Sequence, residues 1–409
     1  MPDVTLTVKL QIYPTEKEKS VLLNNMKLYA QACTWLSEQA FKIGIFSANK
    51  LQKLFYSTIR KNFKLKSQMA ISVTRTVAAK YETIKTYLKS HPAYFKDEEK
   101  DKTYKYNRNL NWLLKPVVFS TPQLDLVRKR DWCFADKDNQ SLSLNTIEGR
   151  ITVKCNTKAH EQFFDEKSHE KKWKFGTGRI VVKNNKWYFY ISATKSFAES
   201  SIDHTIVGID RGLRYPVYAA DTNGNSYSKS GEELRKKRDK YQKTRRSLQS
   251  KNTKGAKRVL KRISGRENRW MADVNHCTSK TLVERYAPGT RFVVEDLTDV
   301  SFDEKNMHTK EQTYELRSWT FYDLEMKLEY KAHMKHCKLD RVSAKYTSQR
   351  CPKCGTIRKE SRNRDKHIYS CPVCKFTAND DYTAALNIMQ LGVRLANGEE
   401  NPKYSKGAA

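Results

Sequence analysis

Apolar and polar side chains alternate over residues 4–13, which predicts a β-strand with one buried face. Pro14 ends this strand. Thr15 can cap the helix that follows, because Glu18 stands three residues later and completes a capping box. Beyond the cap, apolar residues recur at alternating steps of four and three, as on the buried face of a helix. This stripe consists of Leu22, Met26, Tyr29, Cys33, Leu36 and Ala40.

A second apolar stripe extends the predicted helical block to about residue 113. It consists of Val73, Val77, Tyr81, Ile84 and Leu88. From about 115 to 197 the period changes to two, as in short strands, and Asn184 with Asn185 predicts a tight turn. The predicted strands cover residues 142–144, 151–153 and 187–191. Because the strand at 4–13 can join them, we expect a small antiparallel sheet or barrel that carries the helical block as an insertion.

Two further predicted strands are apolar, and each ends in a carboxylate. The strand at 206–209 is followed by Asp210, and the strand at 292–294 is followed by Glu295. A third acid, Asp381, lies in the first turn of the last predicted helix. An unpaired carboxylate is costly to remove from water, so acids at the ends of buried strands indicate a site.

If the two strands are neighbours, the three carboxylates converge and can hold two Mg²⁺ ions, for which oxygen atoms are suitable ligands. Two such ions, about 4 Å apart, activate a water molecule and stabilise the leaving oxygen in phosphodiester hydrolysis. Each acid alone has a simpler explanation, since Asp381 can be a helix N-cap and Glu295 a surface acid. Their combination favours a nuclease in which Asp210, Glu295 and Asp381 are catalytic metal ligands.

The chain contains 78 Lys and Arg residues against 45 Asp and Glu residues, a net charge of +33 at pH 7. Sixteen of the basic residues lie between 235 and 269, where only Asp239 and Glu267 oppose them. A solvated helix face in a merely basic protein is the alternative, but this density favours helices that contact phosphates. The sequence shows neither an apolar run of about 18 residues nor a secretory signal layout. We therefore expect a cytoplasmic protein that binds nucleic acid and no membrane.

Nine cysteines without a secretory signal indicate a reducing compartment. Five of them are scattered singly and are interpreted as small buried apolar residues. These are Cys33, Cys133, Cys155, Cys277 and Cys337. The other four form two CxxC pairs, Cys351 with Cys354 and Cys371 with Cys374, separated by sixteen residues. Four thiolates at this spacing predict one structural zinc ion with no position open for water, in preference to unligated thiols or two redox pairs.

Several motifs together resemble the split motifs of a RuvC-type nuclease. They are Gly208-Ile-Asp210-Arg-Gly212, Val293-Val-Glu295-Asp-Leu297, the two CxxC pairs and Asp380-Asp381-Tyr-Thr-Ala-Ala385. Their order and interruption resemble the TnpB family of transposon-associated RNA-guided nucleases and the compact type V CRISPR effectors related to it. Residues 10–15, 318–331 and 346–351 resemble the opening of that family, the helix before its zinc ribbon and the lead-in to the ribbon. Alignment on the alanine pair places the third acid at Asp381 and leaves open whether Asp380 assists it.

The resemblance implies a multidomain α+β protein with an RNase H-like (RuvC) α/β nuclease domain, an inserted zinc ribbon, and an N-terminal small β-barrel that carries an inserted helical domain. The expected boundaries are 1–14 and 114–200 for the wedge-like β-barrel domain, 15–113 for the helical recognition domain, 201–345 and 377–396 for the RuvC-like domain, 346–376 for the zinc ribbon and 397–409 for a flexible tail.

The resemblance also implies an RNA-guided DNA endonuclease. Its partners would be a guide RNA and target double-stranded DNA chosen beside a short DNA motif, and its metals one structural Zn²⁺ and two catalytic Mg²⁺. A monomer in a prokaryotic cytoplasm is favoured over a dimer. Two other functions stay open, namely a nuclease-inactive guided or zinc-ribbon DNA-binding repressor and a guide-independent transposase. The sequence does not separate a transposon-encoded enzyme from a CRISPR-associated one.

Overall fold

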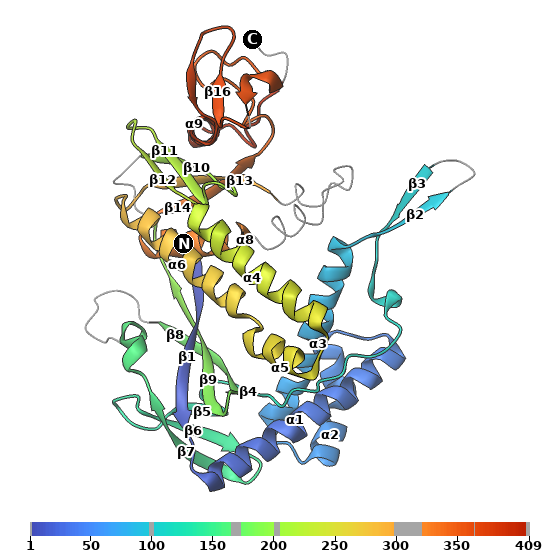
Figure 1. Cartoon of the computed structure of the whole chain (residues 1–409). Coiled ribbons are helices and arrows are strands. Elements are labelled where there is room, and N and C mark those ends of the chain that lie inside the picture. The colour runs from blue at the N-terminus through green and yellow to red at the C-terminus, as the bar shows by residue number, and fades with distance from the viewer. Residues whose placement is uncertain are drawn as a thin grey trace. The chain divides into compact units, whose positions relative to one another are not determined.

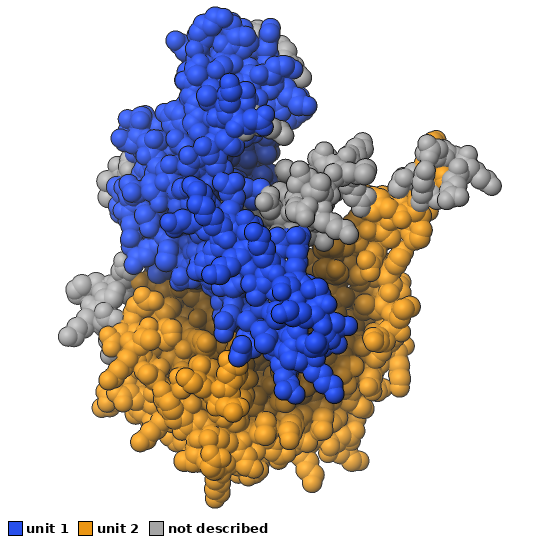
Figure 2. All heavy atoms as spheres, in the orientation of Figure 1, with its two compact units in different colours: residues 1–4, 196–409 blue, residues 5–195 orange. Residues whose placement is uncertain are grey.

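The computed structural model describes residues 2–97, 102–164, 173–199, 205–297, 321–363 and 365–405. The chain forms two compact units (Figure 2). Thr5–Lys195 make up the N-terminal unit, and Met1–Val4 with Ser196–Ala409 make up the C-terminal unit. Within the described ranges, no helix combines the length and the apolar composition that a bilayer-spanning segment needs.

The N-terminal unit contains a seven-stranded sheet in the order β4-β8-β9-β1-β7-β6-β5. Its strands are β1 (Asp3–Tyr13), β4 (Leu124–Leu126), β5 (Trp132–Phe134), β6 (Ser141–Thr146), β7 (Gly149–Asn156), β8 (Lys174–Lys183) and β9 (Lys186–Ser196). Strand β1 lies between β9 and β7 (Figure 1), as the alternating sequence pattern predicts. Among the described strands β4 and β5 form two edges, so the sheet is an open near-barrel where the sequence predicts a small barrel.

The hairpin between β8 and β9 confirms the turn predicted from two adjacent asparagines. Asn184 and Asn185 both adopt the left-handed backbone conformation, with φ of 51° and 58°. Two successive residues of this kind form the two-residue turn whose twist matches that of antiparallel strands. Lys183 and Lys186 are consequently cross-strand partners at the end of the hairpin.

Three helices of the N-terminal unit are α1 (Glu16–Ile43), α2 (Ala48–Phe63) and α3 (Ser67–Ser90). Thr15 and Glu18 form the predicted capping box at the start of α1. Every residue of the first predicted stripe is buried, and in the second stripe only Ile84 is not fully buried. A buried hydrogen bond of 2.9 Å between the hydroxyl groups of Ser37 and Tyr81 joins α1 to α3.

Beyond α3 the structure departs from the predicted helical block. The sequence pattern predicts helix as far as residue 113, whereas α3 ends at Ser90. The elements that follow are the antiparallel strands β2 (Ala93–Asp97) and β3 (Lys102–Tyr106) and the short helix η1 (Leu110–Trp112). Pro92 disfavours a helical backbone in the residue before it. Aromatic side chains such as Phe95 and Tyr104, which are cross-strand partners, favour strands. The prediction of a helix over this segment is therefore wrong.

The C-terminal unit contains a five-stranded sheet in the order β12-β11-β10-β13-β14. Its strands are β10 (Ile206–Asp210), β11 (Val217–Asp221), β12 (Ser226–Lys229), β13 (Arg291–Asp296) and β14 (Lys338–Ser343). Strands β10, β11 and β12 pair in antiparallel fashion, and β13 and β14 continue the sheet parallel to β10. The two strands that the sequence predicts to end in carboxylates, β10 and β13, are thus direct neighbours.

The helices of the C-terminal unit are α4 (Glu232–Lys251), α5 (Lys254–Ile263), α6 (Arg266–Glu284), α8 (Phe321–Met334) and α9 (Asp380–Ala396). The basic run at 235–269 forms α4, α5 and the first turn of α6 (Figure 1), so it is helical as predicted. Helix α8 begins at Phe321. Trp319, which the sequence pattern also assigns to this helix, lies outside the described residues.

Different helices cover the two faces of the five-stranded sheet. Val207 and Val294 pack with residues of α6 and α8, whereas Val293 packs with residues of α9. Successive side chains of a strand point to opposite faces. Asp210 and Glu295 therefore point to the face that α9 covers.

Helix α9 lies against strand β10 with no room for a side chain between them. A Cβ atom on Gly208 would lie 2.2 Å from the carbonyl oxygen of Ala385 and 2.2 Å from the backbone nitrogen of Met389. A Cβ atom on Gly392 would lie 2.5 Å from the side chain of Val293. One glycine on each element thus lets the helix rest directly on the sheet. This contact fixes where the first turn of α9 lies relative to the end of β10.

The expected flexible tail packs against α9 as far as the structure describes it. Tyr404 is buried, and its hydroxyl donates a hydrogen bond of 2.8 Å to the carbonyl of Asn387. The guanidinium of Arg350 lies 4.4 Å from the centroid of the Tyr404 ring. Tyr404 and the ion pair between Arg394 and Glu399 therefore anchor a segment whose polar composition predicts a free end.

Gly208→Ala is expected to destabilise the C-terminal unit, because the new methyl group would overlap backbone atoms of α9 that cannot rotate away. Overpacking of this kind costs about 1–3 kcal/mol and occasionally more. Thermal unfolding should show a lower midpoint for this variant. In the matched control Gly255→Ala, the nearest atom to the new Cβ is 4.0 Å away, and the substitution removes a helical glycine, which stabilises by about 0.5–1 kcal/mol. An unchanged midpoint for Gly208→Ala contradicts the close packing of helix on strand.

Candidate active site and zinc centre

Asp210 and Glu295 lie side by side at the ends of neighbouring strands. Ile209 is paired with Val294 in the parallel register of β10 and β13, so the next residue of each strand is the acid. Both side chains point to the face that α9 covers, as their alternation with the core residues requires. The expectation that these two strands are neighbours is confirmed, and the catalytic role of their acids stays a prediction.

Helix α9 brings Asp381 to the same face without using it as a helix cap. Asn379 is the N-cap, and its side-chain oxygen accepts hydrogen bonds from the backbone nitrogens of Asp381 (3.0 Å) and Tyr382 (3.1 Å). Asp381 Oδ1 lies 3.7 Å from the guanidinium of Arg362. Asp381 Oδ2 is buried and has no hydrogen-bond partner in the described part of the chain. The simpler explanation of Asp381 as an N-cap is therefore wrong.

The three carboxylates influence one another electrostatically. Burial raises the pKa of Asp210 well above its ordinary value, and the charges of Glu295 and Asp381 raise it further. Burial also raises the pKa of Glu295, against the hydrogen bond from Thr347, which lowers it. The pKa of Asp381 is raised by burial and then by the adjacent Asp380. Like charges gathered away from water are costly unless a cation balances them, so this arrangement favours cation binding.

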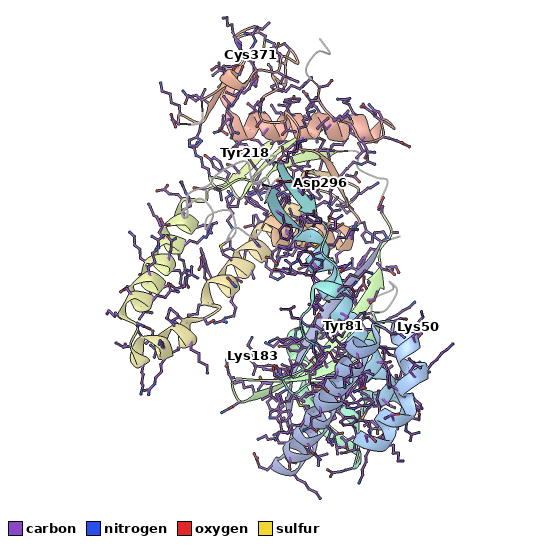
Figure 3. The ribbon with its side chains drawn as sticks, turned by 90° about the vertical axis from the view of Figure 1, so that its right-hand side faces the viewer. Lys50, Tyr81, Lys183, Tyr218, Asp296 and Cys371 are labelled. Carbon is purple, nitrogen blue, oxygen red and sulfur yellow. The ribbon has the colours of Figure 1, made fainter. Side chains whose placement is uncertain are left out.

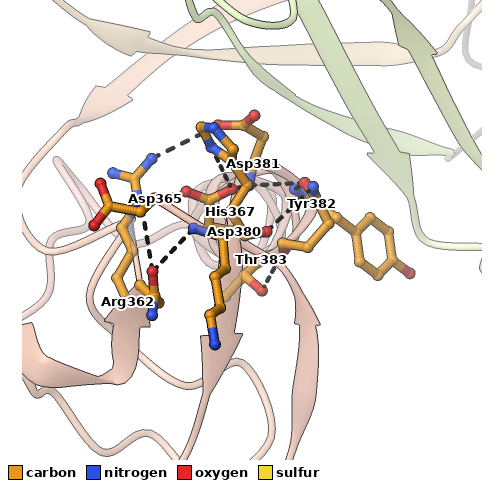
Figure 4. A network of polar contacts seen from close by, with 10 residues as sticks. Arg362, Asp365, His367, Asp380, Asp381, Tyr382 and Thr383 are labelled. Carbon is orange, nitrogen blue, oxygen red and sulfur yellow. Dashed lines mark hydrogen bonds and ion pairs between the residues drawn. The ribbon is translucent and has the colours of Figure 1, made fainter.

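Asp380 has a different environment from Asp381 (Figure 4). It is fully buried, and its Oδ2 accepts a hydrogen bond of 2.8 Å from Arg362 Nε. Its Oδ1 lies 3.9 Å from His367 Nδ1 and accepts a hydrogen bond of 3.1 Å from the backbone nitrogen of Asp381. Both oxygens of Asp380 thus have partners, whereas one oxygen of Asp381 has none among the described residues.

Two side chains whose role the sequence analysis does not identify hold Glu295 in place. The hydroxyl of Thr347 donates to its carboxylate, and the guanidinium of Arg211 donates to its backbone carbonyl at 2.5 Å. Arg211 also donates at 2.5 Å to the carboxylate of Glu325 on α8, and this ion pair is buried. Arg211 and Thr347 lie within the motifs that carry the family resemblance, but a motif does not tell which atom each residue binds.

Four cysteine thiols meet in the zinc ribbon, where Cys371 is labelled in Figure 3. The Sγ atoms of Cys351 and Cys374 are 3.5 Å apart, those of Cys354 and Cys371 are also 3.5 Å apart, and all four lie within 4.8 Å of one another. A tetrahedron with Zn–S bonds of about 2.3 Å separates its sulfurs by about 3.8 Å. None of the four is in a disulfide. Their chemistry and spacing fit the predicted structural zinc.

The two cysteine pairs sit in turns of the same form. Gly355 donates a backbone hydrogen bond of 3.0 Å to the carbonyl of Cys351, and Lys375 donates one of 3.1 Å to the carbonyl of Cys371. Gly355 and Lys375 have φ of 79° and 58°, so the chain turns back in the same way at each pair. The strands that accompany these turns are β15 (Arg362–Asn363), β16 (Ile368–Ser370) and β17 (Thr377–Asn379).

Among the described residues, only these four cysteines bring three or more potential metal ligands within 4.8 Å of one another. Asp210, Glu295 and Asp381 share a face of the sheet and a common electrostatic environment, but their oxygens are not gathered that closely.

Asn387 links helix α9 to the residues that lead into the zinc ribbon. Its side chain is fully buried and donates hydrogen bonds of 2.8 Å to the carbonyls of Thr347 and Arg350. In return, the guanidinium of Arg350 donates to Asn387 Oδ1 at 3.1 Å and to Gln390 at 2.7 Å. Because Thr347 also holds Glu295, the lead-in connects one carboxylate to the helix that carries another.

Two family models match parts of the chain. Residues 321–388, from α8 through the ribbon into α9, match the model described as Cas12f1-like, TNB domain. Residues 181–299, which include β10 and β13, match the OrfB_IS605 model, described as probable transposase.

Known proteins are similar to this chain over about half of its length. The CRISPR-associated endodeoxyribonuclease Cas12f1 of Sulfoacidibacillus thermotolerans is 32% identical over 223 residues, which cover 50% of this chain and 50% of that protein. The TnpB-like protein MJ0751 of Methanocaldococcus jannaschii is 27% identical over 55% of this chain and 82% of its own. The putative RNA-guided DNA endonuclease InsQ of Escherichia coli K12 is 28% identical over 54% of this chain and 59% of its own. The chain spans about half the length of the curated Cas12f1 relatives it matches.

The fold is similar to that of Cas12f1 in the cryo-EM structure of a Cas12f1–sgRNA–target DNA complex. The TM-score is 0.55 at 14% identity, and the match covers 95% of this chain and 99% of that chain. The fold and the site thus define a mixed α+β protein of Cas12f-like architecture with a RuvC/TNB region and a four-cysteine zinc-binding group. The family models and the relatives that match the chain are those of the TnpB/Cas12f-like family, which confirms the resemblance found in its motifs.

Cys371→Ser is expected to lose zinc and to loosen the first turn of α9, because the ribbon holds Asp380 through Arg362. The binding free energy of a structural zinc ion is on the order of 10 kcal/mol in small zinc modules, and it is free energy of folding. Metal analysis should fall from one zinc ion per chain towards none, and amide hydrogen exchange should speed up at residues 380–382.

Cys277→Ser is the matched control, since Cys277 is exposed on α6 and outside the cluster. It should keep both the metal and the slow exchange. Full zinc content in Cys371→Ser would contradict the metal assignment, and zinc loss with unchanged exchange would contradict the coupling to α9.

Proposed function

We propose that this protein is an RNA-guided DNA endonuclease in which Asp210, Glu295 and Asp381 hold two Mg²⁺ ions and cleave DNA phosphodiester bonds. One observation carries the proposal. Two acids end adjacent strands, and a third begins the helix that crosses them, with an oxygen that lacks a partner among the described residues. Three antiparallel strands continued by two parallel ones support an RNase H-like (RuvC) core.

Magnesium fits the donors at this site. The three groups offer hard oxygen ligands. Their negative charges repel one another away from water, and a bound cation would offset this repulsion. Bound there, the two ions would supply activation of a water molecule and stabilisation of the leaving oxygen. A two-ion site divides its carboxylates between the ions, so these need not gather as closely as four ligands of one ion.

The chain's own contribution is to hold the carboxylates in fixed orientations. Thr347 orients Glu295, and Asn379 caps α9 so that the carboxylate of Asp381 stays available. Arg362 engages Asp380 at 2.8 Å. This favours Asp381 as the metal ligand and gives Asp380 a positioning role between the ribbon and the helix.

The basic helices are suited to hold nucleic acid by its backbone. Arg238 and Arg245 form ion pairs with Glu267 at 3.7 and 2.7 Å, which join α4 to α6. The other fourteen basic residues between 235 and 269 are exposed. Exposed cations at this density neutralise phosphates regardless of sequence, and the choice of target can then come from pairing with a guide RNA, as in guided effectors generally. The likeness in fold to a protein solved with sgRNA and target DNA supports these partners.

Two other functions have less support from the site and the comparisons. A nuclease-inactive repressor does not need three carboxylates on one face of the sheet. A guide-independent transposase is favoured by the description of one family model, but the ribbon and α8 match the model described as Cas12f1-like.

Asp210→Ala is expected to reduce DNA cleavage by more than about a thousandfold while nucleic-acid binding persists, because the variant loses a ligand of the catalytic metal. The assay compares cleavage of target DNA by the guide-loaded protein in Mg²⁺ with binding in a gel-shift measurement. Asp296→Asn is the matched control. Asp296 follows Glu295 but is exposed and points to the opposite face of the sheet. Undiminished cleavage by Asp210→Ala would contradict the assignment of Asp210 as a ligand of the catalytic metal.

Protein purified from its native host is expected to carry a discrete RNA, because the proposed function depends on a guide. Sequencing of the co-purified RNA should give one dominant species, and its removal should abolish target choice. Recovery of only random fragments, together with cleavage of DNA ends without RNA, would instead favour the transposase.

A further inference from the structure

Three tyrosines form a continuous aromatic surface next to the carboxylates. Tyr215 lies between β10 and β11, Tyr218 lies on β11, and Tyr382 follows Asp381 in α9. The ring centroids of Tyr215 and Tyr218 are 5.3 Å apart, and those of Tyr218 and Tyr382 are 5.8 Å apart. All three side chains are partly exposed, so they do not form a closed core.

The register of the sheet fixes how close this surface lies to the acids. Tyr218 is the direct cross-strand partner of Asp210, so both side chains stand on the face that α9 covers (Figure 3 labels Tyr218). Partners of this kind have Cβ atoms about 4.5–5.5 Å apart. The ring of Tyr382 turns away from the Asp380–Arg362 network (Figure 4) and meets Tyr218 instead.

Arg214 adds an unused cationic donor at the same place. Its guanidinium lies 5.3 Å from the centroid of the Tyr215 ring, and its charge acts on Asp381, where it opposes the rise of the pKa. The Nη1 atom of Arg214 is buried and has no hydrogen-bond partner among the described residues. A buried N–H without an acceptor costs free energy, so the atom is suited to an acceptor that a ligand supplies.

Aromatic rings beside an arginine are the elements that bind single-stranded nucleic acid. Each base has an aromatic face that can stack on a ring, and arginine pairs with phosphate. In a duplex both faces of each base are covered by neighbouring bases. A base inside a duplex therefore cannot lie against these rings, whereas an unpaired base can.

We propose that Arg214, Tyr215, Tyr218 and Tyr382 form a nucleotide subsite that holds one unpaired nucleotide of the DNA strand beside the three carboxylates. Arg214 donates to a phosphate oxygen, and the base lies against the tyrosine rings. This inference rests on the proposed function, because the strand is its substrate. It adds that the site selects a locally unpaired strand by stacking, independently of base identity.

The test uses the full-length protein with Ca²⁺ in place of Mg²⁺ and single-stranded DNA oligonucleotides that carry one 2-aminopurine at successive positions. Stacking quenches the fluorescence of this base. Tyr218→Ala should abolish the quenching at one position and weaken binding about 5- to 150-fold, the range expected for one base–aromatic contact. Tyr218→Phe keeps the ring and should keep both signals. Tyr322→Ala, which removes a tyrosine that is 73% exposed on α8, should also change neither.

A second measurement separates stacking from a structural effect. In Mg²⁺, an abasic nucleotide at the quenched position should raise the KM of the wild type to that of Tyr218→Ala and should not raise that of the variant further. Equal losses in Tyr218→Phe and Tyr218→Ala would overturn the proposal, as would quenching by a duplex or only by an RNA oligonucleotide. If thermal melting shows that Tyr218→Ala is unfolded, Tyr215→Ala in the connection between the strands takes its place, with the same expectations.

The outcomes also separate this proposal from the proposed function. A wild-type protein that never cleaves DNA refutes the nuclease, while the binding measurement still decides whether the subsite exists. Full cleavage with binding that is unchanged in Tyr218→Ala and Tyr215→Ala refutes the subsite and leaves the nuclease intact.

Discussion

The arrangement of the C-terminal unit depends on the direct contact between helix α9 and strand β10. At Gly208 the strand has no side chain, and at Gly392 the helix has none, so backbone and side-chain atoms of the two elements touch. A larger residue at either position would lift the helix from the sheet and carry its first turn away from the strand ends. The position of Asp381 relative to Asp210 and Glu295 is thus set by two residues that carry no chemistry of their own.

The zinc ribbon holds the same helix from its other side. Asn387 binds the backbone of the lead-in, and Arg362 binds Asp380 at the start of the helix. The helix is therefore fixed by the sheet beneath it and by the four-cysteine module at its N-terminus. The ribbon separates the acidic motifs in sequence, but in space it supports the helix that carries one of them.

Residue periodicity was sufficient to predict the elements that have one buried face. The stripe from Leu22 to Ala40, the strands that end in Asp210 and Glu295, and the cysteine pairs all follow from spacing alone. The sequence could not decide between Asn379 and Asp381 as the helix cap, because both residue types cap helices and the helix start is uncertain by one or two positions. The β2–β3 hairpin was missed although its signals, Pro92 and the alternating aromatic residues, are local. The anchored Tyr404 could not be predicted, because it depends on contacts with Asn387 and Arg350, which are distant in sequence.

The long separation between the acids has a consequence for how the protein is made. Asp381 follows Asp210 by 171 residues, and the whole ribbon lies between β14 and the helix. A ribosome completes β10 and β13 well before α9 emerges, so the growing chain exposes the apolar face of the sheet and only two of the three acids. The three acids can thus come together on one face of the sheet only after the last helix has been made.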